Sequence, residues 1–507
     1  MDINRYVVVG GGTAGWISAS LLAKKLKGDP TKTVTIIESP NIPIIGVGEG
    51  TVPSIRETLR KIGISERDLF VHCDATFKQS IKFTNWLDNS IHGKYNSYHH
   101  LFDYPFPFGD NLCPYWHNDQ SSDFAEMVSI QQHTAESMRA PKDMVHREFE
   151  GVSDYAYHFD AHKFAVLLKR NAIDNLGIEY IQDNVTDVRL GTENLIEAIV
   201  LEQCGDKNFD FYVDCSGFSS ILLGGSLEIP FIDKKDVIFS NRALTVQVPE
   251  EESVIPPYTI STAHKAGWVW DIALSRRRGV GFVFSDHFMA QDQAYQKLER
   301  YVGRSLDSLN VRAIKMKIGH RKKAWHKNCV AIGLSQGFVE PLEATAILIS
   351  DFSANFLCNK LPHNTSELPV LEKRFNNAVI YTWERVIDFV KLHYCISDRQ
   401  DSDFWIENRN TNSIPDSLLE KLSLWKHSYP TKDDFFSKFE VFDIENYLYI
   451  LCGMKYGFTK RLLDPQAMDR YGEQVVKVLM AAKEQQKLLP DQRALLKKLK
   501  LHGFPSI

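Results

Sequence analysis

The stretch Tyr6-Val7-Val8-Val9-Gly10-Gly11-Gly12-Thr13-Ala14-Gly15 decides the fold of this chain. Its apolar residues predict a buried strand, its glycines predict a tight turn, and the apolar spacing over residues 17–26 predicts a helix directly after the turn. Gly10 permits the turn, Gly12 lets backbone approach a pyrophosphate, and Gly15 lets the helix pack on the strand. Because the N–H groups that open the helix point at the phosphates, the stretch predicts a dinucleotide-binding unit.

A second strand strengthens this prediction. Thr33-Val34-Thr35-Ile36-Ile37 is typical of a strand and ends in Glu38, about 23 residues after Gly15. An acid near that distance holds a ribose hydroxyl in dinucleotide-binding folds. The alternative for Glu38 is a solvated carboxylate at a strand end.

Three later segments favour FAD over NAD as the dinucleotide. Residues 45–53, Ile-Gly-Val-Gly-Glu-Gly-Thr-Val-Pro, have the glycine density of a backbone strap against a flat ligand. Asp214-Cys215-Ser216-Gly217 resembles the strand-end segment that closes over the dinucleotide in many flavin monooxygenases. Residues 329–333 predict a strand whose following turn, residues 334–345, delivers backbone groups to an isoalloxazine ring. The residues expected to bind the cofactor are Gly10, Gly12, Thr13, Ala14, Gly15, Glu38, Val47, Glu49, Gly50, Val185, Leu334 and Ile347.

The composition limits the class of protein. The chain has 507 residues, of which 44% are hydrophobic, so it can bury a full core. With a formal net charge of -5, the chain has no general electrostatic attraction to nucleic acid or to an anionic membrane. This charge favours a small organic substrate. The eight cysteines form no CxxC pair, which argues against a structural zinc site or a disulfide framework and favours a reducing cytoplasm. We find no apolar run long enough for a membrane span and no signal-peptide core.

A lysine follows the nucleotide fingerprint in an apolar and aromatic setting, Asp74-Ala75-Thr76-Phe77-Lys78. Partial desolvation lowers the pKa of a lysine, and an ammonium can donate hydrogen bonds, so Lys78 is a candidate for handling an electrophile. The alternative is a lysine whose stem covers apolar surface while its head stays in water. The local residues alone leave both interpretations open.

Several segments in order resemble one family, the flavin-dependent tryptophan halogenases and their indole-halogenating relatives. The resemblance is strongest over the first 350 residues. It implies an α/β fold, with a Rossmann-like FAD-binding domain of the GR2-type flavin monooxygenase/halogenase class and an interleaved, mainly helical substrate-binding region. The FAD-binding domain is expected at residues 1–90 and 151–360, and the substrate-binding region at residues 91–150 and 361–507. The matching segments are residues 10–16, 47–51, 75–78, 267–272 and 337–345, the last reading Gly-Phe-Val-Glu-Pro-Leu-Glu-Ala-Thr.

The resemblance also implies a mechanism. In the family, reduced flavin, oxygen and a halide give hypohalous acid, which travels through a tunnel to a lysine beside an aromatic substrate. Lys78 matches that lysine, as a hydrogen-bond donor to the acid or as a haloamine. Glu343 matches the active-site glutamate that steadies the electrophile and stabilises or takes the proton lost by the ring, and the Pro-Leu-Glu register favours it over Glu340. Thr345 and Ala346 match the halide site, although the family usually has glycine in place of Ala346.

The remaining site residues follow from the same resemblance. Trp268 and Trp270 alternate along an expected strand, so their rings share a face; in the family such rings line the passage from flavin to substrate, and otherwise they are a core pair. His100 and Phe102 are the expected sandwich for an indole ring. The histidines there could instead bind metal, but no carboxylate or cysteine spacing supports a metal site. Tyr447 lies where many relatives have tryptophan, so free tryptophan, another indole, a phenol or a larger scaffold stay open as substrates.

Two rival functions remain at this stage. An aromatic hydroxylase shares the glycine fingerprint and the 214–217 segment but does not require Lys78, Glu343 or the tryptophan pair. A flavin-binding protein without turnover is the second. Since only one dinucleotide site is visible, the family implies that a separate flavin reductase supplies FADH2, with O2 and chloride or bromide as co-substrates. A homodimer is the default expectation.

Overall fold

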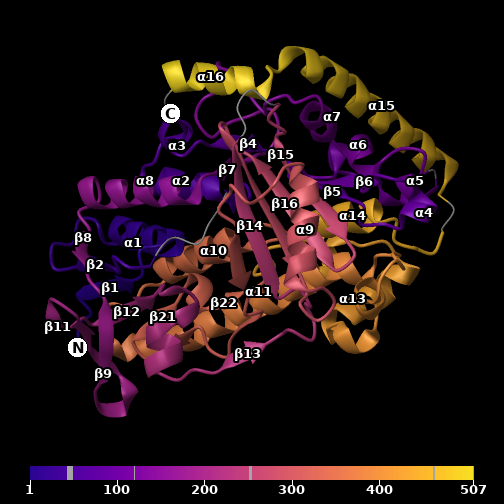
Figure 1. Cartoon of the computed structure of the whole chain (residues 1–507). Helices are drawn as coiled ribbons and strands as arrows, with labels where there is room; N and C mark the ends of the chain where they lie inside the picture. The colour runs from indigo at the N-terminus through magenta and orange to yellow at the C-terminus, as the bar shows by residue number, and fades with distance from the viewer. Residues whose placement is uncertain (43–48, 119, 250–253, 461–462, 506–507) are drawn as a thin grey trace.

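A six-stranded sheet carries the nucleotide fingerprint in the computed structural model, which describes residues 1–42, 49–118, 120–249, 254–460 and 463–505 (Figure 1). Its strand order is β20-β21-β12-β1-β2-β8, and all neighbours from β21 to β8 are parallel. The bounds are β1 (Arg5–Val9), β2 (Thr33–Glu38), β8 (Glu179–Gln182), β12 (Phe211–Asp214), β20 (Trp325–His326) and β21 (Cys329–Ala331). The predicted Rossmann-like α/β unit is therefore confirmed.

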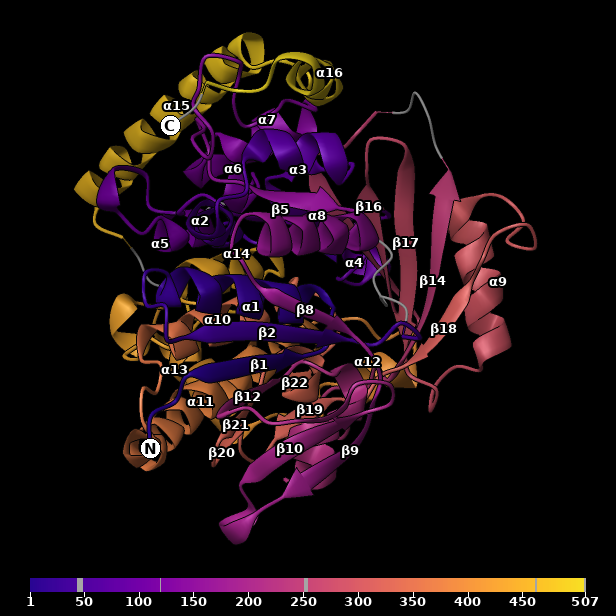
Figure 2. The ribbon, with the colours of Figure 1, turned by 90° about the vertical axis from the view of Figure 1, so that its left-hand side faces the viewer.

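The first strand is buried on both faces, as its unbroken apolar run predicts. Tyr6 and Val8 of β1 face the larger core, while Val7 and Val9 face a second core. Helix α1 (Thr13–Leu26) covers β1 and β2 on the first face and packs against α8 (Ala161–Asp174) and α10 (Thr345–Asn359) (Figure 2). The second core lies against the small antiparallel sheet of β9 (Val185–Leu190), β10 (Ile196–Leu201) and β11 (Gly205–Lys207).

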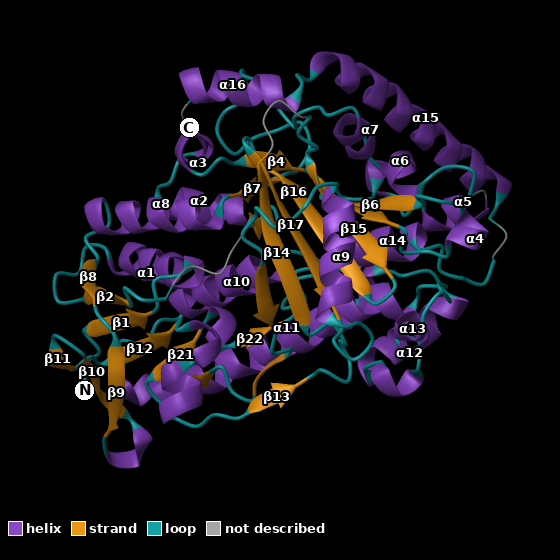
Figure 3. Cartoon of the chain, in the orientation of Figure 1, coloured by secondary structure: helices purple, strands orange, loops and turns teal. Residues whose placement is uncertain are grey.

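A larger sheet of seven strands, in the order β18-β14-β17-β16-β15-β5-β6, forms the wall beside the nucleotide unit (Figure 3). Only the strand around residues 268–270 was expected from the sequence. Parallel pairing of β5 with β15 brings the segment after Lys78 against the middle of the chain. The bounds are β5 (Ser80–Thr84), β6 (Ser97–Leu101), β14 (Arg242–Pro249), β15 (Tyr258–His264), β16 (Gly267–Ala273), β17 (Arg277–Phe284) and β18 (Arg312–Lys315).

A three-stranded sheet sets the glycine strap beside the lysine strand. The central strand β7 (Ala156–Phe159) pairs with β3 (Glu49–Gly50) on one side and with β4 (Thr76–Lys78) on the other. Gly50 and Thr76 both lie opposite His158. Residues far apart in sequence therefore meet around one strand.

The C-terminal region is mainly helical, as predicted. Helix α15 (Pro465–Leu488) ends before Pro490, and α16 (Gln492–His502) begins after it. These two helices pack on α7 (Gln131–Glu136) and α3 (Glu66–His72), respectively. The main helices are α11 (Leu368–Cys395), α13 (Asp416–His427), α14 (Ile444–Gly453), α15 (Pro465–Leu488) and α16 (Gln492–His502).

All eight cysteines are free thiols. Within the described ranges, none of the helices combines the length and apolar character needed to cross a membrane. The division into two domains at residues 90, 150 and 360 stays a prediction.

Candidate active site

One cavity of about 400 Å³ joins the glycine turn to the buried lysine. Its walls come from the turn after β1, the ends of β2 and β12, the strap at β3 and the segment that leads into α10. Val47 lies outside the described residues. Of the residues expected from the sequence, those that line the cavity are Gly10, Gly12, Thr13, Ala14, Glu38, Glu49, Gly50, Lys78, Val185, Trp270, Leu334, Thr345, Ala346 and Ile347.

The glycine turn fits a pyrophosphate. Gly10 has φ +122°, and a Cβ there would lie 2.1 Å from the carbonyl oxygen of Cys215. Gly15 is in the contact between turn and helix, where a Cβ would lie 1.8 Å from the Gly10 oxygen. By contrast, no protein atom lies within 4 Å of a Cβ built on Gly12, which lines the cavity. Backbone at Gly12 is therefore open to close approach by a ligand.

The carboxylate at the end of β2 is held in place. Glu38 Oε2 accepts hydrogen bonds from Lys169 Nζ at 2.7 Å and from the Tyr180 hydroxyl at 2.8 Å. A Cβ on Gly11 would meet Glu38 Oε1 at 2.1 Å, so the carboxylate lies directly against the turn. Glu38 is thus not freely solvated, and Oε1 can accept from a ribose hydroxyl.

The start of α10 is suited to an anion. Ala344 precedes the helix in the left-handed region, with φ 56° and ψ 34°, and no side chain caps the helix. The first N–H groups of a helix have no partner within the helix and carry its positive dipole end. Thr345 and Ala346, which open the helix, both line the cavity. A halide can bind here without a charged side chain.

Lys78 is buried, with 1% of its surface exposed. Its Nζ donates to the Thr51 carbonyl oxygen at 3.0 Å and lies 5.2 Å from the centre of the Phe102 ring. Burial lowers the pKa of Lys78 to about 8, although the charge of Glu343 opposes this shift. The interpretation of a solvated lysine head is therefore wrong for this chain.

Two histidines hold Glu343. Its carboxylate contacts His100 Nδ1 at 2.9 Å and His393 Nε2 at 2.8 Å. Burial alone raises the pKa of Glu343, but the charges and hydrogen bonds of the two histidines outweigh it and bring that pKa to about 2. An ionised carboxylate is consequently kept in an almost fully buried position.

The neighbouring Glu340 is in a different environment. It accepts hydrogen bonds from Trp268 Nε1 at 3.3 Å and from the Tyr394 hydroxyl. Burial raises the pKa of Glu340 to about 7, since its hydrogen bonds only partly offset the loss of solvent. The two glutamates of this loop therefore differ in charge at moderately acidic pH.

The tryptophan pair lies between the cavity and the site of Glu340. The rings of Trp268 and Trp270 are 6.1 Å apart, and Trp270 lines the cavity. Gly281 on the next strand makes room for it, because a Cβ there would lie 2.0 Å from the indole. Trp268 packs instead against Trp86.

The expected substrate contacts are distributed over two places. His100 and Phe102 both lie near the lysine and glutamate pair. Tyr447 is buried in an aromatic cluster with Phe389, Trp425 and Phe435. Its neighbour Asn446 is the residue that reaches the site, with Oδ1 3.0 Å from His100 Nε2. The roles of His100, Phe102 and Tyr447 in substrate binding stay predictions.

Sequence reasoning missed His393. It is fully buried on α11, where Asp388 and Lys391 are also buried in an otherwise apolar stretch. Polar residues at core positions of a helix need partners, so this pattern was the available signal. The partner itself is 50 residues away and was not readable.

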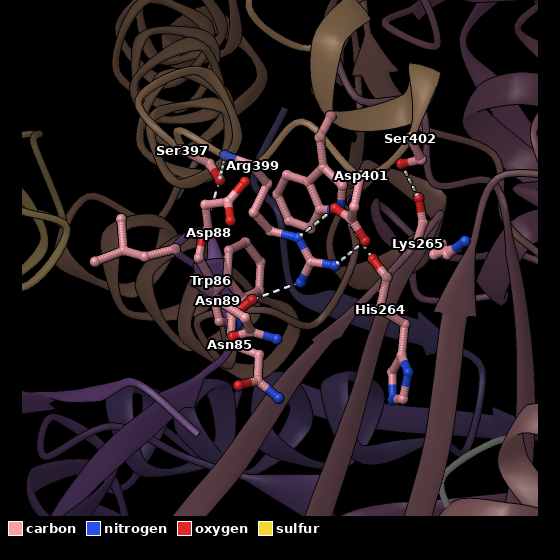
Figure 4. A network of polar contacts seen from close by, with 12 residues as sticks. Asn85, Trp86, Asp88, Asn89, His264, Lys265, Ser397, Arg399, Asp401 and Ser402 are labelled. Atoms are coloured by element: carbon pink, nitrogen blue, oxygen red, sulfur yellow. Dashed lines mark hydrogen bonds and ion pairs between the residues drawn. The ribbon is translucent and has the colours of Figure 1, made fainter. Parts of the chain in front are cut away.

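A polar network fixes the end of α11 behind the site (Figure 4). The guanidinium of Arg399 donates twice to Asp401, at 2.9 and 2.7 Å, and once to the Asn85 carbonyl oxygen at 2.5 Å. Ser397 donates to the Trp86 carbonyl oxygen at 2.7 Å. Trp86 also packs edge-on against the His393 imidazole.

Fold and site together define a flavin-dependent enzyme of the halogenase class. The family model for tryptophan halogenase matches residues 5–468. The tryptophan 6-halogenase ThaL of Streptomyces albogriseolus is 33% identical over 84% of this chain and 83% of its own length. The tryptophan 7-halogenase RebH of Lentzea aerocolonigenes is 30% identical over 96% of each. A solved tryptophan halogenase from Shewanella frigidimarina matches 100% of this chain and 99% of its own, with 38% identity and a TM-score of 0.96.

The chain belongs to the tryptophan halogenase family. The predicted family and the predicted class of enzyme are confirmed.

Proposed function

We propose that this protein halogenates an indole-type aromatic ring, as in tryptophan or a relative, with FADH2, O2 and chloride or bromide. The observation that carries the proposal is a cavity that has the glycine turn on one wall and buried Lys78 on another. The named activities of ThaL and RebH support an indole substrate. They do not fix the ring position for this chain.

The residues along the cavity have different roles in this proposal. Reduced flavin, when bound, supplies hypohalous acid from oxygen and the halide. The turn at Gly12 and the acid Glu38 hold the dinucleotide, and the start of α10 at Thr345 and Ala346 holds the halide. Trp270 lines the same cavity, and in this proposal its indole keeps the arene away from the flavin.

Lys78 and Glu343 carry out the halogenation. The ammonium of Lys78 donates a hydrogen bond to the oxygen of hypohalous acid, which makes the halogen more electrophilic. The ring carbon bonds to the halogen as the oxygen–halogen bond breaks, and the oxygen leaves as hydroxide. Glu343 takes the ring proton, the electron pair of that C–H bond returns to the ring, and hydroxide takes up a proton to become water. A carboxylate with a low pKa is sufficient because the protonated arene is a strong acid.

A separate flavin reductase supplies FADH2 in this proposal, by transient contact or by diffusion. An aromatic hydroxylase is the second candidate, favoured only by the nucleotide site. It leaves the buried Lys78 and the two histidines on Glu343 without a role.

The test is mass spectrometry of tryptophan and of indole after incubation with the protein, FAD, a flavin reductase, NADH and either halide. We expect a product in which one halogen replaces one hydrogen, and its loss in Lys78→Met with flavin binding retained. The matched control is Lys391→Met, which removes another buried lysine whose pKa is also lowered to about 8 by burial but whose Nζ binds Asn408 and Ser413. A gain of oxygen in place of halogen would establish the hydroxylase instead.

A further inference from the structure

A buried threonine lies beside Lys78 on the wall of the cavity. Thr259 belongs to β15, and it lines the cavity together with Lys78 and Gly50. A Cβ built on Gly50 would lie 3.3 Å from Lys78 Nζ and 3.5 Å from Thr259 Oγ1. The ammonium and the hydroxyl are therefore both close to one point above the backbone of Gly50, although they come from strands that are far apart in the sequence.

Gly50 leaves room at this point. Its φ is not in the left-handed region, so the backbone conformation does not itself require glycine. A side chain there would enter the space between Lys78 Nζ and Thr259 Oγ1, and its Cβ would also lie 3.6 Å from His158 Cδ2. The lack of a side chain at Gly50 thus keeps a small polar space open beside the lysine.

The hydroxyl of Thr259 is held in place from behind. Its Oγ1 lies 2.8 Å from Nε2 of His158, which is fully buried on β7. Burial lowers the pKa of His158 well below its usual value, and the charge of Lys78 lowers it further, so this imidazole is neutral. In one tautomer the ring accepts from Thr259 and leaves the lone pairs of Oγ1 available; in the other it donates and leaves the O–H available. In both cases Oγ1 can form another hydrogen bond.

Lys78 also has hydrogen-bonding capacity to spare. An ammonium has three N–H donors. One donates to the Thr51 carbonyl oxygen at 3.0 Å, and among the described residues Nζ has no second hydrogen-bond acceptor. A small molecule beside Gly50 can therefore accept from Lys78 and pair with the Thr259 hydroxyl at the same time.

Hypohalous acid has the chemistry that this pair of groups requires. Its oxygen accepts a hydrogen bond from an ammonium, and the same oxygen and its O–H can pair with a hydroxyl. A molecule held by one hydrogen bond can turn about it, whereas two hydrogen bonds on the oxygen fix the direction of the halogen. Orientation of this kind lowers the barrier of a transfer between two bound molecules.

We propose that Thr259 is a further catalytic residue, whose hydroxyl and Lys78 Nζ together hold hypohalous acid beside Gly50. The identity of the bound molecule rests on the proposed function, whereas the two-point polar site does not. Thr259 keeps the acid at the lysine until the arene takes the halogen, and so limits its escape into solution.

The first test needs no flavin and no turnover. In a crystal structure of the flavin-free protein, one ordered water molecule should lie within hydrogen-bond distance of both Lys78 Nζ and Thr259 Oγ1. Valine has nearly the shape of threonine but no hydroxyl, so Thr259→Val should lose this water or displace it toward the lysine. If no single water contacts both atoms in the unmodified protein, the proposal is overturned.

The second test follows the fate of the electrophile. Thr259→Val should form less halogenated product for each FADH2 oxidised, by roughly three- to tenfold, which is the range that one net hydrogen bond confers. The missing halogen should appear in a β-diketone trap added to the solution. Thr259→Ser retains the hydroxyl and should restore the yield, and the Kd for FAD should be the same in all of these proteins.

The matched control is Ser261→Ala, which removes another buried hydroxyl from the same strand. Ser261 lies two residues further along β15, is fully buried, and has no partner for its Oγ among the described residues. Its yield should stay that of the unmodified protein. An unchanged yield in Thr259→Val overturns the proposal, as does a weaker affinity for FAD that accounts for the loss. An unmodified protein that shows the shared water but halogenates neither tryptophan nor indole overturns the proposed function alone.

Discussion

Lys78 Nζ donates a hydrogen bond of 3.0 Å to the carbonyl oxygen of Thr51, which joins the lysine strand to a residue of the glycine strap. Thr51 is in turn bound to β7, through its N–H and its hydroxyl to the Tyr157 carbonyl oxygen. The lysine head is thus fixed from the same segment that borders the cofactor cavity. A displacement of Thr51 would therefore move the hydrogen-bond partner of Lys78 Nζ.

The first prediction concerns the charge of Lys78. If the ammonium is the working form, the halogenation rate should fall as the pH rises through about 8, the value to which burial lowers the pKa of Lys78. Initial rates from pH 6 to 9.5, with reduced flavin supplied photochemically, measure this. Lys78→Arg, which stays charged, should be slower and lack that alkaline fall. A rate that rises through pH 8 would show that the neutral amine reacts, by way of a haloamine.

A buried ion pair near the C-terminal helix gives a prediction for stability. Lys142 Nζ lies 2.8 Å from Glu66 Oε2, and both side chains are fully buried. The hydroxyl of Tyr155 donates to Glu66 Oε1 at 2.7 Å. Since removing one charge leaves the other without compensation, Glu66→Gln should lower the free energy of unfolding by about 3–5 kcal/mol.

Urea unfolding measures that loss, with Glu57→Gln as the control. Glu57 pairs with Arg60 at 3.0 Å, and about half of each side chain is exposed, so its loss should change the unfolding free energy by less than about 1 kcal/mol. Equal effects for the two variants would contradict the prediction.

The predictions from the sequence were most accurate for structure that neighbouring residues form together. The strand, turn and helix of residues 6–26 are adjacent in the chain, and each residue type agrees with its place in the unit. The large sheet was not predicted because β5 and β15 pair across more than 170 intervening residues, by the register of Ser80 with Tyr258. Pairing of that kind leaves no periodic signal in either segment alone.

The same contrast holds for the site, between residues recognisable from their own segment and residues that matter through a long-range contact. Lys78 and Glu343 were predicted because each lies in a recognisable segment, and the structure buries both side chains. His393 was not, because its importance comes from a contact with Glu343 that no spacing encodes. The same holds for Asn446, which was overlooked in favour of the larger aromatic side chain beside it.

The start of α10 gives a prediction about the halide. Ala346 lines the cavity at the second position of the helix, and we expect its methyl group to restrict access to the N–H groups there. Ala346→Gly should lower the KM for halide severalfold, and more for bromide than for chloride because bromide is the larger ion. Competition between the two halides, read from the ratio of brominated to chlorinated product, measures this. The fold should tolerate the change, since a glycine in a helix costs about 1 kcal/mol relative to alanine. An unchanged ratio would place the halide elsewhere.

Two substitutions in the glycine turn should separate an effect on folding from an effect on ligand binding. Gly10→Ala places a methyl group 2.1 Å from the Cys215 oxygen at φ +122°, so it should destabilise the protein and abolish flavin binding. Gly12 has φ -79° and ψ 179°, which alanine adopts readily, and its Cβ would meet no protein atom within 4 Å.

Gly12→Ala should therefore unfold at the same temperature as the unmodified protein when no flavin is present. Its methyl group would occupy the space through which the pyrophosphate reaches the backbone, so the Kd for FAD should rise at least tenfold, about 1.4 kcal/mol. Flavin fluorescence titration and thermal unfolding without ligand measure the two quantities separately. A Gly12→Ala protein that binds FAD as tightly as before would mean that the cofactor does not approach this turn, and the assignment of the cavity would have to change with it.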